Sequence, residues 1–233
     1  MAPAFVRMLL YDVVAFDCCG TLIDREGGME RALRRLGREL GVKLDAPALV
    51  RRYLQHEMCL EQGSYRRYRD VLRLGLIALF KEQGISLPPR ASRALADSLP
   101  LWRPFPDTAP TLRRLRARGY RTALLSNVDD SLLRPSIKRI GVPFDYVVTA
   151  DAVRSYKPAA RHWQRLLAVC GAPKRRILYA GASLVQDIIP ARTLGLECVW
   201  INRRRERALP GAAPRHVFAD LRPLGKLLIP NSR

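Results

Sequence analysis

The sequence predicts an α/β protein with a doubly wound parallel sheet that is interrupted after its first strand by a helical insertion. Three observations lead to this fold class. Short runs rich in β-branched residues alternate with amphipathic stretches over most of the 233 residues. Most of these stretches stop at a glycine, as helices commonly do at their C-terminal cap. Finally, residues 24–104 contain helical patterns but no convincing strand.

Five apolar runs are expected to form buried parallel strands, because unbroken apolar runs are typical of strands that are covered on both faces. They span 12–16, 121–125, 145–149, 176–180 and 197–201. The amphipathic stretches between them predict helices at 108–119, 129–141 and 160–171. The tail 216–228 predicts one more short strand and a helix.

The insertion shows helical patterns at roughly 29–40, 46–62, 65–83 and 90–99. Pro104 and Pro106 mark the return to the sheet. We therefore expect an α/β core made of 1–23 and 105–233, and a helical cap made of 24–104. A bundle inserted after the first strand would cover the carboxyl ends of the strands and could act as a lid.

The charge is strongly basic, with 41 Lys and Arg against 21 Asp and Glu, a formal net charge of +20. Such a charge attracts anionic partners. Many arginines recur at helical spacing, as in 31–38, where they would form a solvated face. No zinc-finger spacing or RNA-binding signature accompanies them, so a small anionic substrate is favoured as the partner over nucleic acid.

The cysteines and the N-terminal segment indicate a cytoplasmic protein. The five cysteines lack CxxC spacing, which argues against a disulfide framework or a structural zinc site. The apolar run 5–10 is interrupted by Arg7 and soon followed by Asp12, so it is too short and too charged for a signal peptide or a membrane span. The sequence leaves open whether the protein forms a homodimer.

Polar residues gather where the predicted strands end, which is where doubly wound sheets bind ligands. They are Asp17, Ser126, Asn127, Lys157, Ser183 and Asp187. Each one taken alone is typical of a helix N-cap. Together they predict a site with two carboxylates and one ammonium group, in which Lys157 keeps Asp17 ionised as a nucleophile. Backbone N–H groups of Cys18, Cys19 and Gly20 would face an anionic part of the substrate.

The order of these residues resembles the four motifs of the haloacid dehalogenase superfamily. The chain contains Asp-x-x-Gly-Thr-Leu at 17–22, Ser-Asn at 126–127, Lys-Pro at 157–158 and Gly-x-Ser-x-x-x-Asp at 181–187. The insertion after the first strand resembles the helical cap of that superfamily. The segment "FDCCGTLIDREGG" is most similar to the 2-haloacid dehalogenase-like branch.

Cys19 and Ala182 separate this chain from the Mg²⁺-dependent phosphatases of the superfamily. Those enzymes carry a second Asp two residues after the nucleophile and an Asp in the last motif. A thiol is a poor proton relay, with a reference pKa of roughly 8.5, whereas a halide leaving group needs no proton. The two losses also leave few oxygen ligands for Mg²⁺. The chain is therefore expected to need no cofactor, and Mg²⁺ belongs only to the phosphatase alternative.

The resemblance implies a metal-independent hydrolase that acts on a small 2-halo carboxylic acid or a similar anion through an aspartyl ester. Asp17 would attack the carbon, Lys157 would stabilise charge, and Thr21 would orient Asp17. Ser183 and Asp187 would position or activate water. The groups expected to bind the substrate carboxylate are Ser126, Asn127 and the backbone of Cys18 and Cys19. A cap arginine, Arg51 or its neighbour Arg52, would hold the departing halide.

Alternatives remain open at this point. The chain could be a Mg²⁺-dependent phosphatase with degenerate motifs, or a non-catalytic binding protein that keeps the fold. Nucleophilic chemistry through Cys18 or Cys19 with His162 is a further, minor option.

Overall fold

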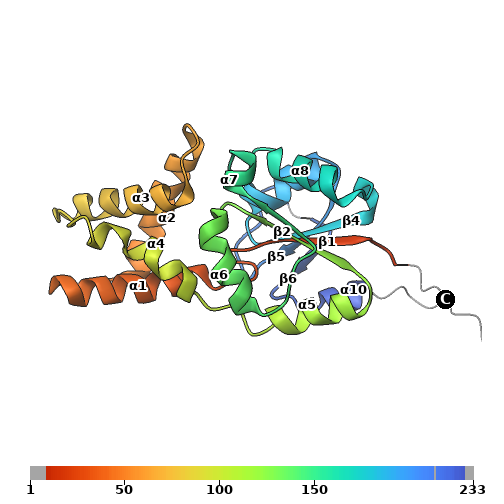
Figure 1. Ribbon diagram of the computed structural model, residues 1–233, viewed down its shortest axis with the longest axis horizontal. Coiled ribbons are helices and arrows are strands. Elements are labelled where there is room, and N and C mark those ends of the chain that lie inside the picture. Colours follow the sequence, from red (N-terminus) through yellow and green to blue (C-terminus); the bar gives the residue numbers. More distant parts are fainter. Residues whose placement is uncertain (1–8, 213, 229–233) are drawn as a thin grey trace, which may run out of the picture.

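The computed structural model describes residues 9–212 and 214–228 (Figure 1). Most of the N-terminal apolar run 5–10 lies outside the described residues. The strands are β1 Val13–Asp17, β2 Arg121–Ser126, β3 Tyr146–Thr149, β4 Ile177–Gly181, β5 Glu197–Ile201 and β6 His216–Phe218. They form one sheet in the order β3-β2-β1-β4-β5-β6. All neighbouring strands are parallel, so the predicted fold class is confirmed.

Both faces of the sheet are buried at its central strands β1, β2 and β4, as the unbroken apolar runs predict. Val14 and Phe16 of β1 belong to one apolar cluster, whereas Val13 and Ala15 belong to the other. Alternate residues of a strand point to opposite faces, so β1 contributes to both clusters. Helices α5 and α10 cover one face, and α7 and α8 cover the other (Figure 1).

The core helices are short and follow the strands closely. They are α5 Thr108–Ala117, α6 Asp130–Ile140, α7 Ala150–Val153, α8 Arg161–Cys170, α9 Ile189–Thr193 and α10 Leu224–Leu227. Two further turns complete the core: the 3₁₀ turn η3 Lys174–Arg176 and the π-helical segment η4 Leu184–Ile188. The short α7 and η4 carry no long apolar period, and the sequence does not predict them.

The regular secondary structure of the insertion is helical, apart from a single β-bridge between Ile23 and Pro104 at its base. It contains α1 Arg25–Leu40, α2 Ala46–Gln62, α3 Tyr68–Glu82, η1 Ala91–Arg93, α4 Ala94–Ser98 and η2 Leu99–Leu101. Helix α1 begins four residues before the expected start, because Asp24 caps it by accepting a hydrogen bond from Gly27 N at 3.0 Å. Gly28 is required for packing, since a Cβ there would lie 2.4 Å from the Trp102 ring.

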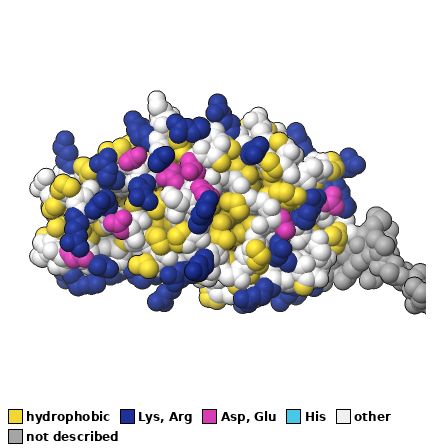
Figure 2. All heavy atoms as spheres, viewed as in Figure 1, with side chains coloured by type: hydrophobic (Ala, Val, Ile, Leu, Met, Phe, Trp, Pro, Cys, Tyr) yellow, Lys and Arg dark blue, Asp and Glu magenta, His cyan; other side chains and the backbone are white. Residues whose placement is uncertain are grey.

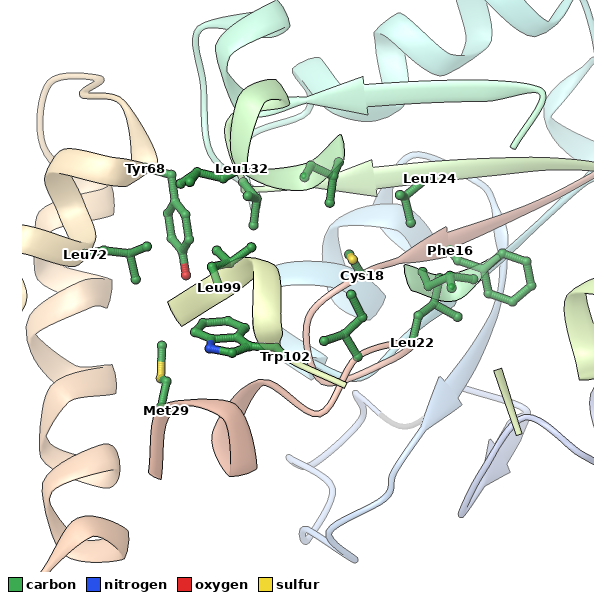
Figure 3. Packing of buried hydrophobic residues seen from close by; sticks show 14 of the residues in the cluster. Phe16, Cys18, Leu22, Met29, Tyr68, Leu72, Leu99, Trp102, Leu124 and Leu132 are labelled. Carbon is green, nitrogen blue, oxygen red and sulfur yellow. The ribbon is translucent and has the colours of Figure 1, made fainter. Parts of the chain in front are cut away.

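The two chain segments that join the insertion to the sheet lie side by side. Asp24 N donates to Arg103 O at 2.8 Å, and Phe105 N donates to Leu22 O at 2.9 Å. One apolar cluster continues across this junction, from Phe16 and Leu22 to Trp102 (Figure 3). The proposed boundary between core and cap at 23/24 and 104/105 stays a prediction.

Basic side chains are spread over the molecular face in Figure 2, with acidic side chains among them. Several arginines of the insertion pair with a carboxylate one turn away: Arg34 with Glu30 at 3.2 Å and Arg35 with Glu39 at 2.9 Å. Exposed pairs of this kind contribute little to stability. They form the solvated face that the helical spacing predicts.

Candidate active site

A cavity of about 430 Å³ lies between the carboxyl ends of the strands and the insertion. The predicted site residues that line it are Asp17, Cys19, Ser126, Asn127, Lys157, Ser183 and Asp187. The residues that line it from the insertion are Asp24, Arg25, Glu26, Leu54, Glu61 and Tyr68. The loops after β1, β2 and β4 and the segment that carries Lys157 therefore meet at one point, under the helices.

Lys157 is the central group of this site, and its side chain is only 2 % exposed. Its Nζ donates to Asp17 Oδ1 at 2.7 Å and to Asp187 Oδ1 at 2.6 Å. Burial alone would favour a neutral amine, but the two carboxylates outweigh it and raise the pKa of Lys157. The ammonium group is therefore a fixed positive charge between two acids.

Asp17 is held by both of its carboxyl oxygens. Oδ1 accepts from Lys157, and Oδ2 accepts from Thr21 Oγ1 at 2.7 Å. The loop between the two residues turns at Gly20, which has a φ of 88°. Thr21 thus returns to the carboxylate that ends β1, and it fixes the orientation of Asp17.

Asp187 is bound by groups from its own segment and from the sheet. Tyr179 donates its hydroxyl to Asp187 Oδ1 at 2.7 Å, and Ser183 N donates to Oδ2 at 3.1 Å. Burial, followed by the charge of Asp17, raises the pKa of Asp187. Gly181 makes this approach possible, because a Cβ there would lie 2.5 Å from Asp187 Cβ.

Asn127 fixes the segment that carries Lys157. Its Oδ1 accepts from Lys157 N at 2.7 Å, and its Nδ2 donates to Lys157 O at 3.3 Å. Ser126 is buried, and its Oγ accepts from Val128 N at 3.2 Å. Both residues therefore have structural roles while they line the cavity.

Comparison with known proteins bears directly on this arrangement. The sequence model of the haloacid dehalogenase-like hydrolase family matches residues 11–195, a range that includes all four motifs. The chain belongs to the haloacid dehalogenase-like hydrolases. It is a hydrolase of this type, so the alternative of a non-catalytic protein is not supported.

Individual relatives of this hydrolase include both dehalogenases and a phosphatase. The chain is 28 % identical to the (S)-2-haloacid dehalogenase of Pseudomonas sp. (strain YL) over 195 residues, 82 % of each protein. It is 30 % identical to the glyceraldehyde 3-phosphate phosphatase of Methanothermobacter thermautotrophicus over 196 residues, 81 % of this chain and 84 % of that one.

A solved structure shows the same fold. The L-2-haloacid dehalogenase from Xanthobacter autotrophicus, with chloropropionic acid covalently bound, matches with a TM-score of 0.82. The match covers 93 % of this chain and 98 % of that one at 20 % identity.

The structure places three predicted substrate-binding residues outside the cavity of this hydrolase: Arg51, Arg52 and Cys18. Arg51 is exposed on α2 and does not line the cavity, and Arg52 pairs with Glu82 at 2.6 Å on the outer surface. From the insertion, the arginine that lines the cavity is Arg25, at the start of α1, while Arg203 and Arg204 line it from the core. Cys18 is fully buried in the apolar core and does not line the cavity, whereas Cys19 does.

The arrangement of His162 does not support cysteine–histidine chemistry. The ring is buried beneath the second motif, with Nε2 at 3.2 Å from Ser126 O, and it does not line the cavity. Burial, followed by the charge of Lys157, lowers the pKa of His162 to about 3.

Three further residues of the site are not predicted from the sequence. Tyr179 lies inside an apolar strand, where nothing distinguishes it from a core aromatic residue. Glu61 and Gln186 lie on helical segments and contact each other across the cavity, with Gln186 Nε2 donating to Glu61 Oε2 at 2.8 Å. Burial, followed by the charge of Glu57, raises the pKa of Glu61 to about 8.

The site residues do not fit a Mg²⁺ ion. One oxygen of Asp17 and one of Asp187 are bound to the ammonium of Lys157, while Cys19 and Ala182 supply no oxygen from their side chains. Within residues 9–212 and 214–228, no group of three or more His, Cys, Asp or Glu side chains is arranged to hold a metal.

No helix among the described residues combines the length and the hydrophobicity needed to cross a bilayer.

Proposed function

We propose that this hydrolase cleaves the carbon–halogen bond of a small 2-halo carboxylic acid without a metal ion, through an ester on Asp17. The observation that carries the proposal is the ammonium of Lys157, hydrogen-bonded to Asp17 and Asp187 at 2.7 and 2.6 Å. A fixed cation of this kind keeps a buried carboxylate ionised, as a nucleophile requires. The dehalogenase among the relatives supports the same substrate class.

The first step would be attack by an Asp17 oxygen on the carbon that bears the halogen. The new C–O bond forms as the carbon–halogen bond breaks, and the halogen leaves with the electron pair. The attacking carboxylate loses its charge in this step, while Lys157 stays paired with Asp187. Thr21 holds Asp17 in one orientation, which favours a single direction of attack.

The second step would be attack of water on the acyl carbon of the ester at Asp17. Asp187 and Ser183 are the groups proposed to position that water. The pKa of Asp187 is raised toward neutral pH, and a proton acceptor works best when its pKa lies near the pH of the reaction. Bond cleavage between the acyl carbon and the ester oxygen releases a hydroxy acid and restores Asp17.

Substrate binding would use the core side of the cavity. Cys19, Gly20, Ser126 and Asn127 line it there, and their polar groups are proposed to face the carboxylate of the substrate. A volume of about 430 Å³ exceeds that of the smallest haloacids, so longer 2-halo acids would also fit.

The first test is halide release from (S)-2-chloropropionate, with and without EDTA. Wild-type protein is expected to release chloride in both conditions, and Asp17→Asn is expected to release none. Arg51→Ala is the matched control, because its side chain lies outside the cavity. Chloride release that stops with EDTA, or that continues in Asp17→Asn, would contradict the proposed mechanism.

A second candidate is the Mg²⁺-dependent phosphatase, favoured by the phosphatase relative at 30 % identity. Phosphate release from small phosphate esters that requires Mg²⁺ would select it. Cys19 and Ala182 weigh against it, because neither supplies the acid that ester cleavage needs.

The proposed compartment is the cytosol. All five cysteines are free thiols, which supports a reducing environment.

A further inference from the structure

Glu61 is a carboxyl group of the insertion that reaches the core across the cavity. It lies in the last turn of α2 and accepts a hydrogen bond from Gln186 at Oε2, at 2.8 Å. Asn127 Nδ2 is 3.4 Å from both oxygens of Glu61. Oε1 therefore has no short hydrogen bond among these contacts, on a side chain that lines the same cavity as Asp17.

The proposed direction of attack would place the leaving group on the insertion side of the cavity, which Glu61 lines. A nucleophile that displaces a group from carbon attacks opposite to it, and Asp17 attacks from the core side. The leaving group would then point toward the insertion. Two of the lining side chains there are already engaged with the buried Glu57: Arg25 in an ion pair and Tyr68 by a hydroxyl that donates at 2.7 Å.

The other residues of the insertion that line the cavity are also poor candidates for contact with the leaving group. Leu54 carries no donor, Asp24 caps α1, and Glu26 pairs with Arg204. Among residues 9–212 and 214–228, the hydrogen-bond partners of Glu61 are thus the neutral amides of Asn127 and Gln186.

The charge state of Glu61 decides its effect, since a carboxylate repels a departing anion whereas a carboxylic acid can donate to it. The groups that act on it electrostatically are Glu57, Arg25, Lys157, Tyr53 and Tyr156. Burial, followed by the charge of Glu57, raises the pKa of Glu61 to about 8, against the opposing effect of the two cations. The raised pKa favours the protonated form of Glu61.

We propose that Glu61 is the general acid that protonates the leaving group, and that fluoride is a leaving group this enzyme accepts. The proposal rests on the function proposed above. Fluoride is the most basic of the halides and the poorest leaving group, so it gains most from a proton donor. Chloride and bromide leave without one, which is why the cap acid matters little for them.

Protons balance over the two steps of the reaction. An Asp17 oxygen bonds to the carbon, the C–F bond breaks with its electron pair on fluorine, and fluorine takes the proton of Glu61. Water then hydrolyses the ester at the acyl carbon with Asp187 as the proton acceptor, and the hydroxy acid product leaves with one proton remaining on the Asp17 and Asp187 carboxyls. That proton returns to Glu61, and the net reaction of the organofluorine acid with water gives the hydroxy acid and HF.

The test compares fluoride release from fluoroacetate with bromide release from bromoacetate. Glu61→Gln keeps the shape and the contact to Gln186 but has no acidic proton. Because general acid catalysis contributes roughly 10²–10⁴-fold, we expect fluoride release to fall at least about 100-fold and bromide release to change less than about 3-fold. Glu82→Gln, an exposed residue of α3 that pairs with Arg52, should change neither rate.

The pH profile of the wild-type enzyme gives an independent measurement should Glu61→Gln fold poorly. Fluoride release should decline as pH rises past about 8, because the acid is then ionised. Bromide release should lack this decline.

Wild-type activity on bromoacetate without any on fluoroacetate would overturn the role of Glu61 and leave the proposed function intact. Equal losses of both rates in a folded Glu61→Gln would do the same. Failure with every halo acid would instead refute the proposed function.

Discussion

Lys157 Nζ lies 2.7 Å from Asp17 Oδ1, although 140 residues separate the two in the chain. Neither side chain is more than 9 % exposed. Burial of such a pair removes both charges from water, at a cost that their attraction only partly offsets. The pair fits the proposed chemistry, in which a fixed cation holds the nucleophile Asp17 at the end of β1.

Lys157→Met should remove both activity and stability. Asp17 and Asp187 would then be buried without a counter-charge, which costs about 3–5 kcal/mol of unfolding free energy. Urea unfolding and chloride release measure the two effects. Adding Asp17→Asn and Asp187→Asn should restore most of the stability but none of the activity. A Lys157→Met protein that is as stable as wild type would refute this account of the pair.

Arg25 and Arg51 should behave differently when replaced. Arg25→Met leaves Glu57, which is 3 % exposed, without its ion-pair partner, and breaking a buried pair costs about 3–5 kcal/mol. Halide release should fall as the cavity wall rearranges. Arg51→Met should change stability by less than about 0.5 kcal/mol and leave halide release unchanged, as expected for an exposed side chain. Thermal unfolding and chloride release distinguish the two, and a large effect at Arg51 would show that the sequence interpretation of the cap was right.

Much of the core could be predicted because its signals are local and ordered. The five apolar runs and the tail 216–228 predict all six strands, and the ends of β1, β2 and β4 carry the polar residues of the site. Parallel strands bring these ends to one edge of the sheet, so chain positions far apart become neighbours without any further information.

The residues of the insertion that line the cavity could not be predicted in the same way. Helical periodicity shows that Arg51 and Arg52 share a face, but it does not show that this face is turned to solvent. Glu61 resembles any surface glutamate in the sequence, and only the packing of α2 over the core brings it to the cavity. Tyr179 lies within an apolar strand, so the sequence does not distinguish it from a core aromatic residue.

Cys19→Asp combined with Ala182→Asp should create Mg²⁺-dependent phosphatase activity. The two carboxylates would supply the metal ligands and the proton relay that this chain lacks. Phosphate release from a small ester such as p-nitrophenyl phosphate, measured with Mg²⁺ and with EDTA, tests this. Each single variant serves as a control and should stay inactive. A folded double variant without phosphatase activity would show that further residues separate the two reaction types.

His162 should make the protein lose stability as the pH falls below about 6.5. Burial lowers the pKa of His162 to about 3, so the folded state binds fewer protons than the unfolded state between those two values. Stability is then fully present above pH 6.5 and decreases by up to about 1.4 kcal/mol per pH unit within the window. His162→Gln keeps a donor toward Ser126 O but does not titrate in this range. Urea unfolding of both proteins at pH 6.5 and 4.5 should show the wild type losing roughly 2 kcal/mol more than the variant, whereas parallel losses would mean that His162 is protonated in the folded state.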